Sequence, residues 1–483
     1  MPEQRSPSGG AYDVRRGERA ESVRRAFAEF VTLPLILIGV ILVLGGAGTY
    51  ALDKLQPASL RGLHDFLERH YWPSADTTGQ ILQTISQTVI TVTSITFSLL
   101  LVTVQQTSTS LSSQVFDQFL RRRSNQVCFG FFVGLGVLSL WTAASVNPRF
   151  NPVFGATLIL VCGMAAVGLL LFLLYTTINQ MRPTVVLEAI HDHVVETRVR
   201  LLRDVVQRTR REVGCHDLPA HAVHSEQTGF VHGIDLDRVA SALREAGGGE
   251  VVLEAEIGSF VAYGDRLALL HLTQAESAPA LAQAVRRAVR LERQRTIGDH
   301  DAVFGVQQIA TIGWTSISSA NQNPASGALA IVNLRDILAR VSVEPERPAD
   351  EAPLPIVYPD TFPEALVAAF ESFAVAAGEA HQHQTMAEIL DAMTASLERL
   401  PDTWKVRCVE VLVRTLPIAT SMTPTGELQR ALERVSDALD RAGEEDAAEA
   451  VRRAHAESVG RIPGPEGARA VGARGDGASA VPH

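Results

Sequence analysis

Lysine is almost absent from this chain of 483 residues, which carries only Lys54 and Lys405. The formal net charge of −10 leaves no basic excess for a nucleic acid, so a nucleic-acid partner is not expected. The four cysteines form no close pair, which argues against a disulfide framework and a cysteine-based zinc site. The glycine triplet 247–249 lacks the flanking residues of a phosphate-binding loop, so no nucleotide cofactor is expected.

Charged residues are also missing from four long apolar stretches before residue 180. Each stretch is long enough to cross a bilayer as a helix, and the predicted spans are 31–52, 81–104, 127–146 and 153–178. They define a four-span transmembrane domain over 27–182, whose partner is the lipid bilayer. Because no Asp, Glu, Lys or Arg lies inside these spans, a proton relay or a charge-coupled carrier is not indicated. Apolar residues at helical spacing between Leu60 and Tyr71 predict a short interfacial helix.

Arginines gather near the ends of the spans. They lie before the first span, at Arg121, Arg122 and Arg123 after the second, and at Arg182 after the fourth. Basic residues favour the cytoplasmic side, and these groups share one side only if the chain crosses four times. Both termini are therefore expected in the cytoplasm. Arg121, Arg122 and Arg123 are expected to anchor the chain at anionic headgroups.

The second span is unusual because hydroxyl and amide side chains recur along it. At 3.6 residues per turn, five of them form one stripe: Gln83, Gln87, Thr91, Ser94 and Ser98. Such side chains can bond to their own helix or to a neighbouring one, so the stripe can be a packing seam inside the four-helix bundle. It can equally face water along a pore, or a cavity between protomers. The sequence leaves both interpretations open.

The second half of the chain predicts soluble structure. It comprises a cytoplasmic α+β domain (183–341), a linker (342–360), a helical region (361–459) and a disordered tail (460–483), while residues 1–26 form a cytoplasmic N-terminal segment. Strands are expected at 229–234, 250–256 and 267–272, with a helix at 236–246. Residues 257–270, IGSFVAYGDRLALL, resemble the hairpin of biotinyl/lipoyl-like small barrels, which implies a β-barrel-like segment. The modified lysine of those carriers is missing, so the resemblance implies shape and not swinging-arm chemistry.

Two apolar helices, expected at 301–314 and 325–338, flank a polar loop. This loop, its helices, the segment TGFVHGIDLDRV and the Thr/Ser-rich second span together resemble a bacterial family of predicted membrane proteins, domain of unknown function 2254. The resemblance covers about 27–340 and implies a plasma (inner) membrane location. The family's loop runs Ser-Pro, two residues, Asn-Asp-Pro and then a small hydroxyl residue. The matching positions here are Ser318, Ser319, Gln322, Asn323, Pro324 and Ser326.

Asn323 stands where the family usually has an aspartate, so chemistry that needs this carboxylate is not expected here. The loop is instead expected to be a structural polar turn. The pairs His191/His193 and His381/His383 could be metal ligands, but side chains two residues apart on a helix diverge, so no metal site is predicted. The run Asp299-His300-Asp301 precedes a helix and is expected to supply its N-terminal cap and to complement its dipole.

No nucleophile–base pair, catalytic residue or cofactor site is visible, so the sequence does not indicate an enzyme. Two function classes remain. The polar second span favours an oligomeric channel or pore-like protein, built from copies of this chain with that span near the axis. The large soluble half favours a membrane-anchored scaffold or sensor, whose cytoplasmic domain binds a partner or small ligand at the loop 316–326.

Overall fold

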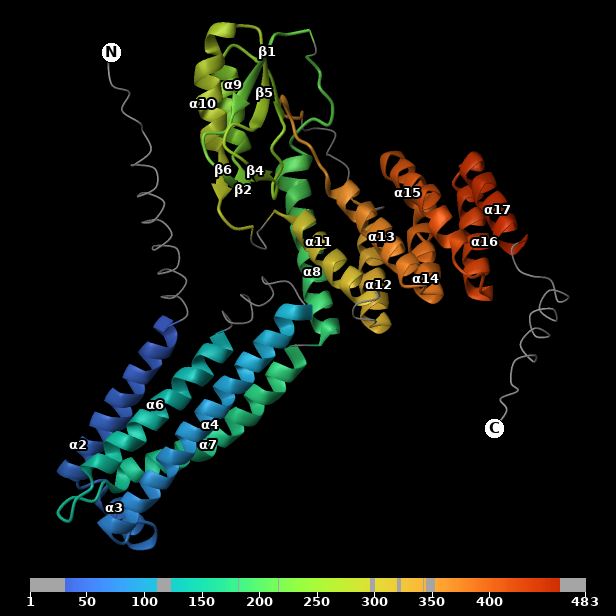
Figure 1. The fold of residues 1–483 in the computed structure, drawn as a ribbon. Helices are drawn as coiled ribbons and strands as arrows, with labels where there is room; N and C mark the ends of the chain where they lie inside the picture. Colours follow the sequence, from blue (N-terminus) through green and yellow to red (C-terminus); the bar gives the residue numbers. More distant parts are fainter. Residues whose placement is uncertain are drawn as a thin grey trace, which may run out of the picture. The chain divides into compact units, whose positions relative to one another are not determined.

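The computed structural model describes residues 31–110, 123–180, 182–215, 217–295, 300–318, 323–341, 343–344 and 352–460. The chain divides into two compact units, of which the first ends at Arg182 and the second begins at Pro183. Figure 1 shows that the first is built of long helices and that the second combines sheets with helices. The expectations for residues 1–26, for Arg121, Arg122, Ser319 and Gln322, and for the tail after residue 460 lie outside the described residues.

The first unit consists of helices along its described length. Residues 31–40 are helical and continue through a π-helical stretch (Ile41–Ala47) into α2 (Gly48–Leu55); the others are α3 (Arg61–His70), α4 (Ala75–Ser110), α6 (Arg123–Ser145) and α7 (Val153–Gln180). Three helical segments are long and apolar enough to cross a bilayer: Val31–Leu55, Gln126–Ser145 and Val153–Thr176. They coincide with three of the predicted spans. The helix α4, which contains the remaining one, is not among them.

Close packing of small residues joins the first span to α6. A Cβ added at Gly130 would lie 2.9 Å from Pro34 Cα, and one added at Gly134 would lie 2.8 Å from Ile41 Cδ1. Only glycine admits this approach, as in the small-residue contacts of other membrane helices. The opposite side of α6 packs against α4, and both contact α7.

The first span extends three residues beyond its predicted end and thereby includes a charged residue. Asp53 is only 5% exposed, and its carboxylate accepts hydrogen bonds from the backbone N–H groups of Phe154 (2.8 Å) and Gly155 (3.2 Å). These N–H groups belong to the first turn of α7, where helix N–H groups lack partners within the helix. Asp53 therefore caps α7, a role that the sequence alone did not reveal.

The second unit begins with α8 (Pro183–Leu201), a π-helical turn (Leu202–Val206) and a sheet-containing part. Its elements are β1 (Ala220–His224), β2 (Gly229–Ile234), α9 (Leu236–Glu245), β3 (Gly249–Leu253), β4 (Phe260–Val261), β5 (Arg266–Leu272), α10 (Ala278–Ala288), β6 (Val289–Glu292) and β7 (Ile356–Val357). The strand orders are β1-β5-β3-β7 and β4-β2-β6. Every pairing is antiparallel except β3 with β7, and α9 and α10 pack beside each other.

The expected barrel-like segment is not formed, because the described strands build two open sheets. The resemblance implied that residues 257–270 form a hairpin, but β4 pairs with β2 whereas β5 pairs with β1 and β3. The two arms of the expected hairpin thus lie in different sheets. Strand β7 lies in the stretch expected to be a linker, and its residues Ile356 and Val357 are buried beside β3.

Helices make up the rest of the second unit: α11 (Ala302–Ile317), α12 (Pro324–Val341), α13 (Phe362–Glu379), α14 (His383–Thr394), α15 (Asp402–Ser421), α16 (Gly426–Arg441) and α17 (Glu445–Gly460). Within the helical region expected over 361–459, residues 426–460 form two helices, α16 and α17. Gly443 separates them with φ +82°, a left-handed conformation that glycine adopts without strain.

Candidate functional site

The polar stripe of the second span lies on one outward face of α4. Gln83, Gln87, Thr91, Ser94 and Ser98 are all exposed in the isolated chain. The opposite face, with Leu82, Ser86 and Val89, is buried against the other helices of the unit. In the described part of one chain, the stripe therefore faces outward from the other helices of the unit.

The hydroxyls and the amides of this face differ in how they are satisfied. The Thr91 hydroxyl donates to Gln87 O (2.8 Å), as threonines in membrane helices commonly do. Within the described part of the chain, the side chains of Gln83 and Gln87 make no hydrogen bond. The outward face of α7 is different, since Val161, Met164, Val167, Leu171, Phe172 and Tyr175 are exposed there. The α7 face thus suits lipid, whereas the outward side of α4 carries two unsatisfied amides together with exposed Ile90, Ile95 and Phe97.

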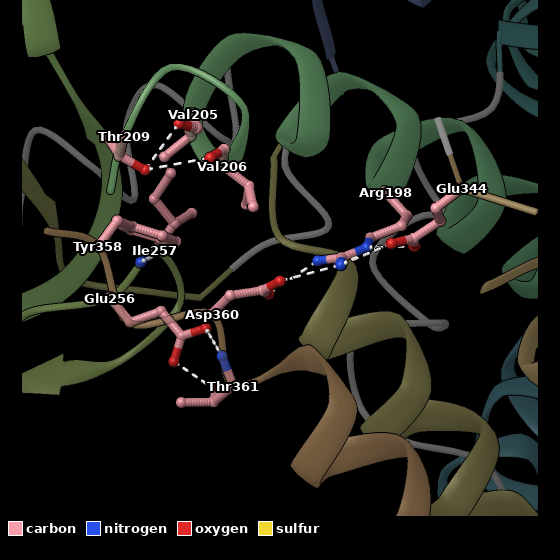
Figure 2. A network of polar contacts seen from close by, with 10 residues as sticks. All are labelled: Arg198, Val205, Val206, Thr209, Glu256, Ile257, Glu344, Tyr358, Asp360 and Thr361. Atoms are coloured by element: carbon pink, nitrogen blue, oxygen red, sulfur yellow. Dashed lines mark hydrogen bonds and ion pairs between the residues drawn. The ribbon is translucent and has the colours of Figure 1, made fainter. Parts of the chain in front are cut away.

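A second polar centre, inside the second unit, is organised around Arg198 of α8 (Figure 2). This guanidinium is 6% exposed and lies between two carboxylates. Its Nε and Nη2 donate to Glu344 (2.8 and 3.1 Å), and its Nη1 and Nη2 donate to Asp360 (2.7 and 2.9 Å). The Phe362 ring covers it, with the centroid 4.5 Å from Cζ. Such paired bidentate contacts fix the start of α13 to α8.

A third carboxylate, Glu256, follows β3 and also belongs to this centre (Figure 2). It is 8% exposed, accepts a hydrogen bond from Thr361 N (3.0 Å) and also bonds the Thr361 hydroxyl. Burial raises the pKa of Glu256 to about 7; the Thr361 hydrogen bonds oppose this shift, while the Asp360 and Asp301 carboxylates add to it. The Tyr358 hydroxyl accepts from Ile257 N (3.2 Å) beside it. The sheet part is thus joined to α13 through a carboxyl that titrates near neutrality.

Comparison with known proteins decides the family. The sequence profile of the family described as "Predicted membrane protein (DUF2254)" matches residues 28–395. The chain belongs to this family. The match confirms the resemblance and extends it beyond residue 340, through α13 and α14, so it includes Arg198, Glu256 and Asp360. No curated protein and no solved structure matches the chain.

The described ends of the loop that carried the family resemblance are Ser318, at the end of α11, and Asn323, at the start of α12. Asn323 N donates to Ser316 O (2.9 Å), and the side chain of Asn323 accepts weakly from Ser326 N (3.4 Å). Ser318 and Ser326 are buried, whereas Asn323 and Pro324 are exposed. Asn323 therefore occupies a capping position at the start of α12, where asparagine and aspartate serve equally well.

A cavity of about 770 Å³ lies beside this connection. The starts of α12, α14 and α16 line it, through Pro324, Ala325, Gln382, His383, Thr385, Thr425 and Glu427 among others. The Nδ1 atom of His383 is buried and has no hydrogen-bond partner among the described residues. A polar hollow of this size can accept a small ligand.

The other residues singled out in the sequence have local partners. The His191 ring contacts Asp336 (2.7 Å) and the His193 ring contacts Thr197 (3.1 Å), so the two rings diverge as expected. Asp301 caps α11 by accepting from Phe304 N (3.0 Å) and is paired with Arg295 (2.7 and 2.9 Å). Arg123 begins α6.

Proposed function

We propose that the protein is an oligomeric channel of the bacterial plasma membrane, with the polar face of α4 at the contact between protomers around a central axis. The observation that carries the proposal is the exposure of all five stripe residues on a helix whose opposite side is buried. The family gives a membrane protein and no activity. The proposal therefore rests on the chemistry of this face.

The proposal follows from the free energy of placing polar side chains in lipid. A polar group left without a partner in hydrocarbon costs several kcal/mol. The amides of Gln83 and Gln87 have no partner within the described part of their own chain, so lipid contact would leave both unsatisfied. A second copy of α4, or water along an axis, satisfies them. Hydrogen-bond donors and acceptors that line a pore contribute to its selectivity.

The proposal includes four crossings of the membrane, with α4 as the second span. Its described length of 36 residues is more than a bilayer requires. With four crossings, the arginine groups near residues 15–25, 121–123 and 182 share the cytoplasmic side, together with both termini and the soluble unit. The soluble unit then stands on the cytoplasmic side of the channel.

Leucine at both Gln87 and Ser94 should reduce ion flux through the full chain in liposomes by about tenfold or more. Each lost polar contact is worth about 1 kcal/mol, and 1.4 kcal/mol corresponds to a tenfold change. The same double variant should alter the oligomer seen by crosslinking or native mass spectrometry. The control, Val92→Leu, changes a partly buried apolar position off the stripe and should leave both measurements unchanged. Unaltered ion flux and unaltered assembly in the double variant would contradict the channel proposal.

A second candidate is a membrane-anchored sensor whose soluble unit binds a small polar ligand. The cavity at the starts of α12, α14 and α16, with the unpartnered His383 nitrogen, favours it. The flux experiment separates the two candidates, because ligand binding at this cavity requires no conduction along α4. A ligand whose stabilising effect disappears when Ala328→Trp fills the cavity would support the sensor.

A further inference from the structure

A buried histidine in the first unit points into a pair of carboxylates. His64 of α3 is 6% exposed, and neither of its ring nitrogens makes a hydrogen bond within the described part of the chain. Its Nδ1 lies 3.7 Å from Glu68 Oε2 and 3.9 Å from Asp65 Oδ1. These separations exceed hydrogen-bond length, so the imidazole is surrounded by acceptors that it does not bond.

The separations suit ligands that share a metal ion. A zinc ion binds nitrogen and oxygen ligands at about 2.0–2.2 Å, which places neighbouring ligand atoms roughly 3–4 Å apart. One ligand atom each from His64, Asp65 and Glu68 lies within 4.8 Å of the other two. His64 and Glu68 are four residues apart on α3 and so share one helix face. Small rotations of the more exposed Asp65 and Glu68 side chains would bring all three ligands onto one ion.

The other ring nitrogen already faces a carboxylate. His64 Nε2 lies 4.0 Å from Asp53 Oδ1, and Asp53 is held by the N–H groups of Phe154 and Gly155 at the start of α7. The edge of the Phe154 ring packs against His64, with centroids 5.5 Å apart. Histidine ligands of metals commonly direct their second nitrogen at a carboxylate, which fixes the tautomer and the ring orientation. Here that arrangement leaves Nδ1 free to bind the metal.

Charge favours a cation at the same point. Asp53, Asp65 and Glu68 face one imidazole, and within the described residues Asp65 and Glu68 have no arginine or lysine partner. We propose that His64, Asp65 and Glu68 bind a divalent transition-metal ion of the zinc class, with Asp53 as the residue that positions His64. One nitrogen and two oxygens form a ligand set that zinc accepts, whereas calcium and magnesium prefer oxygen alone. All three ligands lie on α3, and Asp53 connects the site to the start of α7.

Isothermal titration of the full chain in detergent with Zn²⁺, after chelator treatment, tests the site. Wild type should bind one Zn²⁺ per chain that 5 mM Mg²⁺ does not displace. Glu68→Gln and Asp65→Asn, which keep the size of two partly or fully exposed side chains, should each weaken binding by about 10-fold to 100-fold. Asp53→Asn should weaken it within the same range while retaining an acceptor for the α7 cap. His70→Gln, an exposed histidine on the same helix, is the matched control and should bind as wild type does.

The result is decisive in either direction, because circular dichroism of each variant verifies that the helices persist. Loss of binding in the Glu68, Asp65 and Asp53 variants, with binding retained in His70→Gln, supports the site. Absence of binding in wild type overturns it. Retained affinity in both Glu68→Gln and Asp65→Asn, or an equal loss in His70→Gln, also overturns it.

Discussion

Replacing Arg198 by methionine should lower the free energy of unfolding of the second unit by about 3–5 kcal/mol, the usual cost of removing one partner from a buried ion pair. The guanidinium is 6% exposed and makes four hydrogen bonds to Glu344 and Asp360. Without it, two carboxylates whose side chains are 20% exposed would face each other with no cation between them. Hydrogen exchange of the full chain in detergent should show faster exchange in α8 and in the first turns of α13.

The control for this prediction is Arg340→Met. Arg340 pairs with Asp336 at 2.6 Å, but the two side chains are 56% and 45% exposed. Exposed pairs contribute about 0–1 kcal/mol, so exchange should change little. Equal effects of the Arg198 and Arg340 substitutions would contradict the assignment of Arg198 as the residue that holds α13 against α8.

Replacing Glu256 by glutamine should remove a pH dependence of stability. Burial raises the pKa of this carboxyl from its ordinary value of 4.5 to about 7, so the folded chain holds the proton more tightly than the unfolded chain. The associated stability is fully present below about pH 4.5 and is lost as pH rises through about 7. Glutamine mimics the protonated form, because its oxygen can accept from Thr361 N while its amide donates to the Thr361 hydroxyl. At pH 8.5 the variant should therefore be more stable, on the order of 3 kcal/mol, and near pH 4.5 the two should match.

Glu250 gives the opposite behaviour and serves as the comparison. It is buried, which raises its pKa, but the N–H groups of Gly214 and Cys215 and the Arg210 guanidinium lower the pKa below its ordinary value. Its stabilisation is present above about pH 4.5 and is lost as pH falls. Thermal melts of wild type, Glu256→Gln and Glu250→Gln from about pH 3 to about pH 8.5 measure both effects. Destabilisation by Glu256→Gln at pH 8.5 would refute the neutral-carboxyl interpretation.

The features that follow from local periodicity were predictable from the sequence. Alternation of apolar residues fixed β2 at Gly229–Ile234, and the 3.6-residue period placed Gln83, Gln87 and Ser94 on one face of α4. Three apolar spans were predictable for a different reason, the length and apolar character of their uncharged runs. The pairing of the strands was not predictable. The run 257–270 has the pattern of a hairpin, yet β4 pairs with β2, and β5 pairs with β1 and β3. These partners are set by contacts between distant parts of the chain.

The polar centres were missed because long-range contacts assemble them. Arg198 lies 146 positions from Glu344 and 162 from Asp360, and no local pattern links these residues. Asp53 was overlooked because it lies just beyond the predicted end of the first span. Its contacts with His64 and with the start of α7 form only in the folded chain. One local signal was available there, since His64 and Glu68 have the spacing of two ligands on one helix face.

Cysteine crosslinking between protomers tests most directly whether the polar face of α4 meets another copy of the chain. In a chain whose four natural cysteines are replaced by alanine, single cysteines at Gln87 and at Ser94 should give crosslinked dimers in native membranes, with copper phenanthroline or a short bismaleimide. A cysteine at Val167, which is 61% exposed on the apolar face of α7, should remain monomeric under the same conditions. Dimers from Val167 with none from Gln87 or Ser94 would contradict the account, because the amide-bearing face would then lie away from the protomer contact.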